Sequence, residues 1–252
     1  MIFQYASDLH LEFRVNKEYL KANPLTPKGD VLLLAGDIVP FAIMNKFDNF
    51  FNYLSNNFQT TYWVPGNHEY YQFDAANKRG AFMEKIRPNV FLVNNTAVMH
   101  QETKIIFSTL WSRISPGSQW HIEQNLSDFH VIKYNGYRFS ADWYNQMHDE
   151  SIQFITNELQ HKNEGKTIVV THHVPTFLNY PEQYKGDILN EAFAVELFET
   201  IESSAVDYWI YGHHHNNTAD FTIGNTRMLT NQLGYVQHNE HKFFNKSNTF
   251  TV

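Results

Sequence analysis

The stretch Val31-Leu32-Leu33-Leu34-Ala35-Gly36-Asp37 places five apolar residues directly before a glycine and a carboxylate. A short unbroken apolar run that ends at a turn residue is typical of a buried β-strand. Further short apolar or β-branched runs along the chain predict strands in the same way. They cover Ile2 to Ala6, Thr60 to Val64, Val90 to Val93, Lys104 to Leu110, Thr167 to Thr171 and Tyr208 to Tyr211.

Longer amphipathic stretches separate several of these runs and predict helices. They cover about Ala42 to Phe58, Asp74 to Ile86, Ala141 to Lys162 and Asn190 to Ser203. Alternating strands and helices favour βαβ units, and therefore a largely parallel sheet with helices on its faces.

The end of the chain changes character. Ala219 to Ile223, Gly224-Asn225 and Arg227 to Asn231 predict a strand, a tight turn and a second strand. A last strand is expected near Thr249 to Val252. A second sheet packed on the first would accommodate these strands. The expected fold class is therefore α/β, with a layered β-sandwich flanked by helices.

The length and composition are those of one large domain. The chain has 252 residues and a hydrophobic content of 42%, enough for a single core, so residues 1–252 are expected to form one domain. The segment from Ser112 to Arg138 is rich in aromatic residues and weakly periodic. Because long connections in compact domains are usually functional, this segment predicts a lid or binding insert.

Charge and cysteine content narrow the function. The formal net charge is −7 and no Lys/Arg cluster occurs, which argues against nucleic acid as the main partner. The chain has no cysteine, so any metal must be held by oxygen and nitrogen ligands.

The residues Met1 to Tyr5 lack the features of a signal peptide. No apolar run approaches the ~20 residues that span a bilayer. We expect a cytoplasmic protein.

Five polar clusters each follow a run that predicts a strand. They are Asp8-Leu9-His10, Gly36-Asp37-Ile38, Gly66-Asn67-His68-Glu69, Thr171-His172-His173 and Gly212-His213-His214-His215. Ligands of open α/β sheets bind at the carboxyl ends of the strands, so these side chains are expected to converge. Together they offer enough oxygen and imidazole nitrogen for two divalent ions. Two such ions about 3.5–4 Å apart stabilise both oxygens of a displacement at phosphorus.

The spacing within the clusters supports this interpretation. In Asp8-x-His10 and His213-x-His215 the first and third residues would point the same way in extended backbone. The glycines Gly36, Gly66 and Gly212 would let the backbone turn sharply and pass close to the site. Each cluster alone has a plainer interpretation as a solvated loop or turn. Their joint occurrence in order, each after a strand, favours a metal site.

At these residues the chain resembles the calcineurin-like metallophosphoesterase superfamily. The pattern of that family is Asp-x-His, Gly-Asp, Gly-Asn-His-Asp/Glu, a His after a strand, and Gly-His-x-His. All five elements occur here, between Asp8 and His215. The resemblance implies a metallophosphoesterase-like four-layer α/β/β/α fold, which agrees with the fold expected from the strand and helix pattern.

The resemblance also implies residue roles. Asp8, His10 and His215 would bind one metal, Asn67, His172 and His213 the other, and Asp37 would bridge them. His68 would be the catalytic general acid that protonates the leaving alkoxide. The two divalent ions would be Mn, Fe or Zn. The implied reaction is hydrolysis of a P–O ester bond by a metal-bridging hydroxide.

Several alternatives stay open in the sequence. Glu69 could orient an imidazole or be a plain turn residue. His173 could support the site or face substrate rather than solvent, and His214 could touch substrate or solvent. His121 or His130 could reach the site if the segment 112–138 forms a lid. The oligomeric state is not predicted.

The expected substrate is a small phosphodiester, because few basic residues lie near the clusters. Arg79, Arg113 and Arg138 are the candidates for binding the additional charge of a phosphomonoester. A phosphomonoesterase, including a protein phosphatase-like enzyme, is one alternative, and a non-catalytic scaffold of the same fold is another. The aromatic residues of the long segment could stack on substrate or fill the core: Trp111, Trp120, Phe129, Tyr134 and Tyr137.

Overall fold

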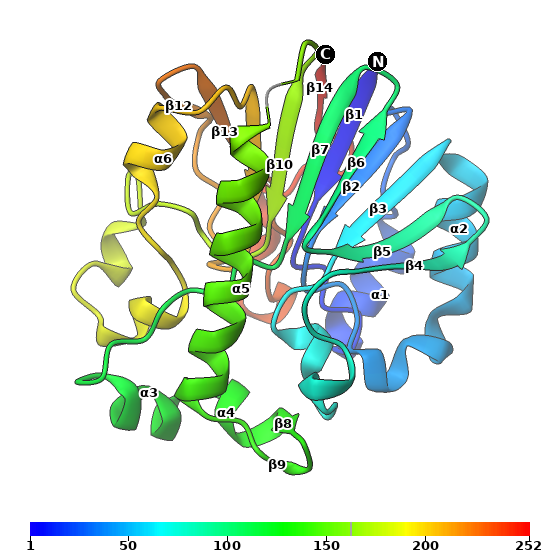
Figure 1. Ribbon diagram of the computed structural model, residues 1–252. Helices are drawn as coiled ribbons and strands as arrows, with labels where there is room; N and C mark the ends of the chain where they lie inside the picture. Colours follow the sequence, from blue (N-terminus) through cyan, green and yellow to red (C-terminus); the bar gives the residue numbers. More distant parts are fainter. Residues whose placement is uncertain (162) are drawn as a thin grey trace.

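Two six-stranded sheets lie against each other in the computed structural model, which describes residues 1–161 and 163–252 (Figure 1). The first sheet has the order β14-β1-β2-β3-β5-β4. Its strands are β1 (Ile2–Ala6), β2 (Val31–Ala35), β3 (Thr60–Val64), β4 (Phe82–Arg87), β5 (Val90–Asn94) and β14 (Thr249–Thr251). Strands β1, β2, β3 and β5 are parallel, and the two edge strands are antiparallel to their neighbours.

The second sheet repeats this arrangement. Its order is β12-β13-β11-β10-β7-β6, with four parallel strands between two antiparallel edge strands. Its strands are β6 (Thr96–His100), β7 (Thr103–Ser108), β10 (Thr167–Thr171), β11 (Tyr208–Tyr211), β12 (Phe221–Ile223) and β13 (Thr226–Thr230). The expectation of a second sheet is therefore confirmed.

The unbroken apolar run of β2 follows from its central place in the layers. Its alternate residues Val31 and Leu33 belong to the core between the two sheets, together with Ile168 of β10. Leu32 and Leu34 point to the opposite face and join the core beneath the helices. Because successive side chains of a strand point to opposite faces, a strand buried on both faces must be apolar throughout.

Helices cover the outer face of each sheet, as Figure 1 shows. The helices are α1 (Arg14–Ala22), α2 (Asp48–Asn57), α3 (Gln119–Asn125), α4 (Asp128–Val131), α5 (Ala141–Gln160) and α6 (Phe198–Glu202). Phe51 and Leu54 of α2 pack on the first sheet, whereas Ile155 of α5 and Ile201 of α6 pack on the second. The layers are α/β/β/α, so the predicted fold class is confirmed.

The insert predicted at residues 112–138 holds α3, α4 and a small hairpin, β8 (Lys133–Tyr134) and β9 (Tyr137–Arg138). These elements lie together beyond one end of the sheets in Figure 1. Phe129 of α4 and Phe139, which follows β9, are buried and form a separate apolar cluster with Tyr144 of α5. Trp111, Phe129 and Tyr134 are buried, while Trp120 and Tyr137 are exposed. Three of the five aromatic residues therefore fill the core.

One predicted helix is wrong. The stretch from Asp74 to Ile86 forms a short 3-10 turn at Ala75–Asn77 and then edge strand β4. Strand β4 pairs with β5, and its alternating half-buried and exposed residues have the pattern of an edge strand. Gly80 lies between the two at a φ of +67°, which interrupts any helix. Pairing with β5 therefore overrides the amphipathic pattern.

Three other predicted helices differ from the observed elements in their bounds. The helix expected from Asn190 to Ser203 is reduced to a 3-10 turn at Ile188–Ala192 and the short α6. The helix expected from Ala42 begins as a 3-10 helix at Phe41–Phe47 before α2. Helix α5 ends at Gln160, and the expected end at Lys162 lies outside the described residues. Helix α1 and strand β6 were not predicted. Within the described residues, no helix is long and apolar enough to cross a membrane.

The core between the two sheets is expected to contribute strongly to the free energy of unfolding. Leu33 is fully buried between the sheets, so Leu33→Ala is expected to lower the free energy of unfolding by about 2–5 kcal/mol, through lost burial and a cavity. Urea unfolding followed by circular dichroism measures this change. The matched control is Leu178→Ala, because Leu178 is 42% exposed and should change stability by less than about 0.5 kcal/mol. Equal losses in both variants would contradict the proposed packing.

Candidate metal centre

Strand register brings the polar clusters together. Ala6 of β1, Leu34 of β2, Trp63 of β3 and Leu92 of β5 are aligned neighbours across the first sheet. The loops that follow β1, β2 and β3 therefore leave the sheet at the same edge. His172 follows β10 and the Gly212–His215 loop follows β11, at the same end of the second sheet. All seven predicted ligands meet there; six of them are buried, and 10% of the His215 side chain is exposed.

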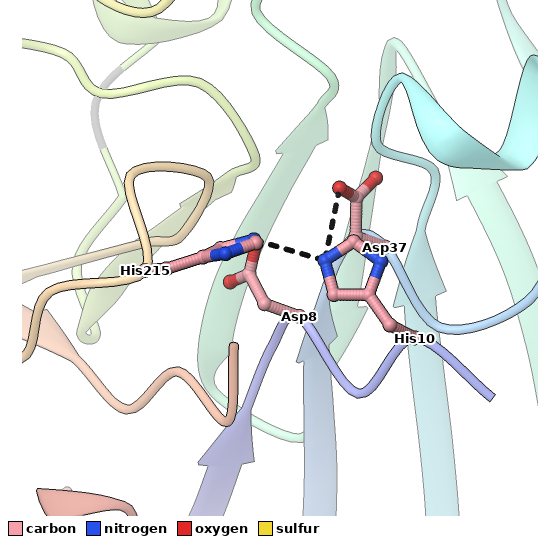
Figure 2. Close-up of side chains that lie close together, drawn as sticks. All are labelled: Asp8, His10, Asp37 and His215. Atoms are coloured by element: carbon pink, nitrogen blue, oxygen red, sulfur yellow. Dashed lines mark hydrogen bonds and ion pairs between the residues drawn. The ribbon is translucent and has the colours of Figure 1, made fainter. Parts of the chain in front are cut away.

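One group of side chains contains Asp8, His10, Asp37 and His215, whose ligand atoms lie within 4.8 Å of one another. His10 Nε2 is 2.9 Å from His215 Nε2 and 3.6 Å from Asp37 Oδ2. His215 Nε2 is also 3.5 Å from Asp8 Oδ1. Figure 2 shows the two imidazoles with these nitrogens facing each other between the carboxylates. Oxygen and imidazole nitrogen atoms gathered in this way suit a divalent cation.

A second group contains Asp37, His172 and His213, with Asn67 beside them. His172 Nε2 is 3.0 Å from His213 Nδ1 and 3.2 Å from Asn67 Oδ1. The same nitrogen is 3.4 Å from Asp37 Oδ1. Asp37 therefore directs one carboxylate oxygen at each group, Oδ2 at the first and Oδ1 at the second.

The outer ring nitrogens of these histidines have protein partners. His10 Nδ1 lies 3.1 Å from Glu12 Oε1, and His215 Nδ1 lies 2.8 Å from Glu240 Oε2. His172 Nδ1 lies 2.9 Å from the carbonyl oxygen of Ala35. A ring N–H that donates to such an acceptor leaves the lone pair of the other nitrogen facing inward. This arrangement orients imidazoles as metal ligands.

The backbone of the site is left-handed at five of the predicted ligands. The φ angles are 55° at Asp8, 47° at His10, 56° at Asp37, 82° at His213 and 51° at His215. The expectation that extended backbone aligns Asp8 with His10 and His213 with His215 is therefore wrong, although each pair does converge. Non-glycine residues in this region cost of order 1–3 kcal/mol each and concentrate at functional sites.

Glu69 has a role that neither alternative from the sequence described. It is fully buried, and its carboxylate accepts hydrogen bonds from the backbone N–H groups of Asp37, Ile38, Val39 and Gly66 and from Trp63 Nε1. Burial, together with the nearby carboxyl of Asp37, raises the pKa of Glu69 to about 8. Glu69 thus connects the loop after β2 to the loop after β3.

Electrostatics favour the charged forms of Asp37 and His172. Burial alone would raise the pKa of Asp37, but His172, His68 and His10 outweigh it and hold this pKa well below its usual range. Burial likewise opposes protonation of His172, yet the carboxyl of Asp37 raises its pKa to about 9. Binding of a metal at His172 must displace a proton, so affinity is expected to increase with pH.

His68 stands beside the two groups rather than within them. Its Nδ1 is 2.8 Å from Glu12 Oε1 and its Nε2 is 3.3 Å from Tyr235 Oη. Its ring stacks on Tyr71, with centroids 4.0 Å apart. Burial lowers the pKa of His68, but Asp37 and Glu12 outweigh burial and raise it above the usual value. The raised pKa favours the protonated ring, which is the form that a general acid requires.

A cavity of about 310 Å³ opens at the centre. Asp37, Asn67, His68, His213 and His215 line one part of it. Residues 126–128 and the segment 180–193 contribute most of the remaining wall. The insert therefore reaches the site, although not through His121 or His130, which are exposed.

Asp128 is the residue by which the insert touches the centre, and sequence reasoning missed it. Its Oδ1 accepts hydrogen bonds from Asn67 Nδ2 at 2.9 Å and Tyr71 Oη at 2.7 Å. Because Nδ2 of Asn67 is engaged here, Oδ1 of Asn67 faces His172. Burial raises the pKa of Asp128. Glu12, two residues after His10, and Glu240 were missed as well; the spacing of Glu12 was the one available signal.

The structure places the histidines and arginines whose roles the sequence left undecided. His173 is buried, contacts Thr109 and Tyr144, and lies beside the ring of His213, so solvent exposure is wrong for it. His214 is also buried and lines the cavity. Among the described residues, the cavity wall includes none of the three candidate arginines. These pair elsewhere: Arg79 with Glu150, Arg113 with Asp149, and Arg138 with backbone carbonyls.

Comparison with known proteins agrees with this geometry. The sequence model of the calcineurin-like phosphoesterase family matches residues 5–217, which include all five clusters. An uncharacterized protein of Acanthamoeba polyphaga mimivirus is 33% identical over 276 residues, covering 96% of this chain and 94% of that protein.

Two solved structures share the fold. Phosphopantetheinyl hydrolase from Mycobacterium tuberculosis matches with a TM-score of 0.69 at 16% identity, covering 98% of this chain and 95% of that chain. A dimetal phosphatase from Danio rerio matches with a TM-score of 0.51 at 13% identity, covering 92% and 87%. Fold, buried His/Asp clusters and family match together define a metal-dependent phosphoesterase, a hydrolase. The chain belongs to the calcineurin-like phosphoesterase family.

Gly66 provides a test of the centre that spares the fold. A Cβ at this position would lie 2.6 Å from His172 Nε2 and also contact Asp37 Oδ1, so Gly66→Ala is expected to displace both side chains. Metal content measured by elemental analysis should fall by at least one ion per chain, with a largely unchanged circular dichroism spectrum. Gly117→Ala is the control, because a Cβ there meets nothing within 4 Å. Full metal loading of Gly66→Ala would contradict the close approach of Gly66 to His172 and Asp37.

Proposed function

We propose that this chain is a binuclear enzyme that hydrolyses small phosphodiesters. One divalent ion would be held by Asp8, His10 and His215, and the other by Asn67, His172 and His213. Asp37 would bridge the two ions. The division of its carboxylate oxygens between the two groups supports this bridging role. The mixed carboxylate, amide and imidazole donors suit Mn, Fe or Zn.

When bound, the ions supply an activated water nucleophile and neutralise charge on the phosphoryl oxygens. The residues of this chain orient the substrate and handle its protons. His68 lies beside both groups, and its N–H contacts to Glu12 and Tyr235 set its ring within the cavity wall. We assign it as the general acid that protonates the departing alkoxide.

The preference for a diester rests on one observation. No lysine or arginine occurs among the described residues that line the cavity. A phosphomonoester carries more negative charge than a diester, and proteins commonly bind that additional charge with Arg or Lys side chains. A diester needs no such partner beyond the two ions.

The chain is proposed to act as a single domain on a small substrate. Residues 1–252 act as one domain, and the insert at 112–138 serves as a wall of the substrate cavity through residues 126–128. The substrate is small and phosphorylated. A phosphopantetheinyl diester belongs in any substrate panel, because a protein of similar fold carries that name.

The test combines metal content with hydrolysis. The protein is loaded with Mn²⁺ and assayed with bis-p-nitrophenyl phosphate and with p-nitrophenyl phosphate. We expect close to two ions per chain, and a higher kcat/KM for the diester. Turnover of the monoester alone would indicate a phosphatase, and an absence of bound metal under any loading would overturn the proposal.

Asp37→Ala checks the bridging role in the same assay. Loss of the shared carboxylate should remove both ions, because each would lose a ligand. Two ions per chain in this variant would contradict the bridge.

His68→Ala tests the general acid separately. The variant should keep its ions, because the proposed ligand set does not include His68. We expect kcat to fall by about 10²–10⁴-fold for a diester with an alkyl alcohol leaving group, which needs a proton. For p-nitrophenolate, which leaves without one, the fall should be much smaller. Loss of metal in this variant would show that His68 is a ligand.

A further inference from the structure

Tyr235 places a hydroxyl group beside the proposed general acid. It lies outside the five polar clusters of the sequence, after the last of them. His68 and Tyr235 both line the cavity, and Oη of Tyr235 is 3.3 Å from Nε2 of His68. Nδ1 of the same imidazole is 2.8 Å from Oε1 of Glu12. Nε2 is therefore the ring nitrogen that a substrate can reach, and the hydroxyl of Tyr235 lies next to it.

The ring and the backbone of Tyr235 are anchored without its hydroxyl group. The backbone N–H donates to Oε2 of Glu240. The ring packs against the imidazoles of His10 and His215, with centroid distances of 4.8 and 4.5 Å. Among the described residues, the hydroxyl has one hydrogen-bond partner, which is His68. The hydroxyl is therefore available to a ligand, while packing keeps it in place.

Two other neutral donors of the cavity wall already have oxygen acceptors. Oη of Tyr71 donates to Oδ1 of Asp128, and Nδ2 of Asn190 donates to the carbonyl oxygen of Tyr184. The described part of the wall holds no lysine or arginine, so polar contacts away from the ions must come from uncharged groups or histidine. Tyr235 differs from the two engaged donors, because its hydroxyl stands beside the general acid and has no oxygen acceptor within the described residues.

Two donors at this separation can share one acceptor. Hydrogen bonds to an oxygen acceptor span about 2.7–3.0 Å, so an oxygen at that distance from Nε2 of His68 can also accept from Oη of Tyr235, 3.3 Å away. Both groups would then meet the same departing ester oxygen. A phenol keeps its proton at neutral pH. It can therefore stabilise negative charge on that oxygen as a hydrogen-bond donor, without transferring its proton.

We propose that Tyr235 is a second catalytic residue, whose hydroxyl donates a hydrogen bond to the leaving-group oxygen while His68 protonates that oxygen. As water adds to phosphorus, the ester P–O bond breaks and its electron pair goes to the departing oxygen. That oxygen takes the Nε2 proton of His68, Tyr235 keeps its own proton, and the proton released by the water restores His68. This inference rests on the proposed function, in which His68 is the general acid, and adds a donor to it.

The experiment compares two diesters that differ only in the basicity of the leaving group, methyl phenyl phosphate and methyl p-nitrophenyl phosphate. Tyr235→Phe removes the hydroxyl and keeps the ring. With the Mn²⁺-loaded full chain, kcat for release of phenol should fall by at least about tenfold. For release of p-nitrophenolate, which is less basic and gains less from a donor, the fall should be under about threefold. The ratio of the two kcat values is insensitive to the fraction of active protein.

Tyr208→Phe is the matched control. Oη of Tyr208 donates to the carbonyl oxygen of Thr251 at 3.1 Å, and Tyr208 lies outside the cavity wall, so its ratio should equal that of the unaltered chain. Elemental analysis of Tyr235→Phe should give an unchanged metal content, because the ring that packs on His10 and His215 remains. An unchanged ratio in Tyr235→Phe would overturn the proposal, and so would loss of metal from this variant.

A double variant separates direct contact with the leaving group from an effect that passes through His68. In the His68→Ala background the general acid is absent. A hydroxyl that contacts the leaving group still acts there, so adding Tyr235→Phe should lower kcat for methyl phenyl phosphate by a further factor of about three or more. No further loss in the double variant would show that the hydroxyl only positions His68, which would overturn direct donation.

Failure of this proposal can be told apart from failure of the proposed function. If diesters are hydrolysed and the ratio stays constant, Tyr235 has no part in departure of the leaving group, and the diesterase stands. If only monoesters are hydrolysed, the diester preference fails. Phenyl phosphate and p-nitrophenyl phosphate then test Tyr235 in the same way, because both ester classes have a leaving-group oxygen. Absence of any hydrolysis would overturn both proposals.

Discussion

The metal centre depends on the hydrogen bonds that the side-chain carboxyl of Glu69 accepts. It accepts hydrogen bonds from the backbone N–H groups of Asp37, Ile38 and Gly66. It also accepts one from the indole N–H of Trp63 in β3. Those N–H groups are buried and have left the hydrogen-bond ladders of their strands. Each would otherwise incur the cost of an unsatisfied polar group, about 1–3 kcal/mol. Glu69 therefore stabilises two loops that the sheets alone would leave without partners.

This connection also explains how Asp37 can hold a left-handed backbone. At a φ of 56°, the side chain of this residue has its oxygens 3.6 Å from Nε2 of His10 in one loop and 3.4 Å from Nε2 of His172 in another. The backbone N–H of His68 donates to the same carboxylate at 2.9 Å. The loops after β2 and β3 thus position each other. Gly36 and Gly66 leave room for the ring of His172 between them.

Sequence reasoning could find these clusters because their polar residues interrupt apolar strands at one end. The run from Val31 to Ala35 predicts both a strand and its burial, and Asp37 follows it directly. The orientation of the side chains could not be predicted in the same way. Asp8 and His10 converge through left-handed backbone rather than strand alternation. That conformation depends on contacts from distant loops, such as the carbonyl of Gly36 that accepts from the N–H of Asp8.

Apart from Glu12, two residues after His10, the residues that support the centre from outside the five clusters give no pattern in the sequence. Asp128 lies in a four-residue helix of a weakly periodic insert, and it meets Asn67 only because the insert folds back over the centre. Strand β4 was mistaken for a helix for a related reason. Its amphipathic pattern is compatible with both structures, and pairing with β5 decides between them.

The charge that a substrate meets in the cavity would come mainly from the ions. Two divalent ions would add about four positive charges at the end formed by the strand loops, enough to invert the local sign in a chain of net charge −7. Among the described residues, the cavity wall contains no lysine or arginine. Recognition of a phosphoryl group would therefore depend on the ions and on short-range contacts inside the cavity, where the low dielectric strengthens each of them.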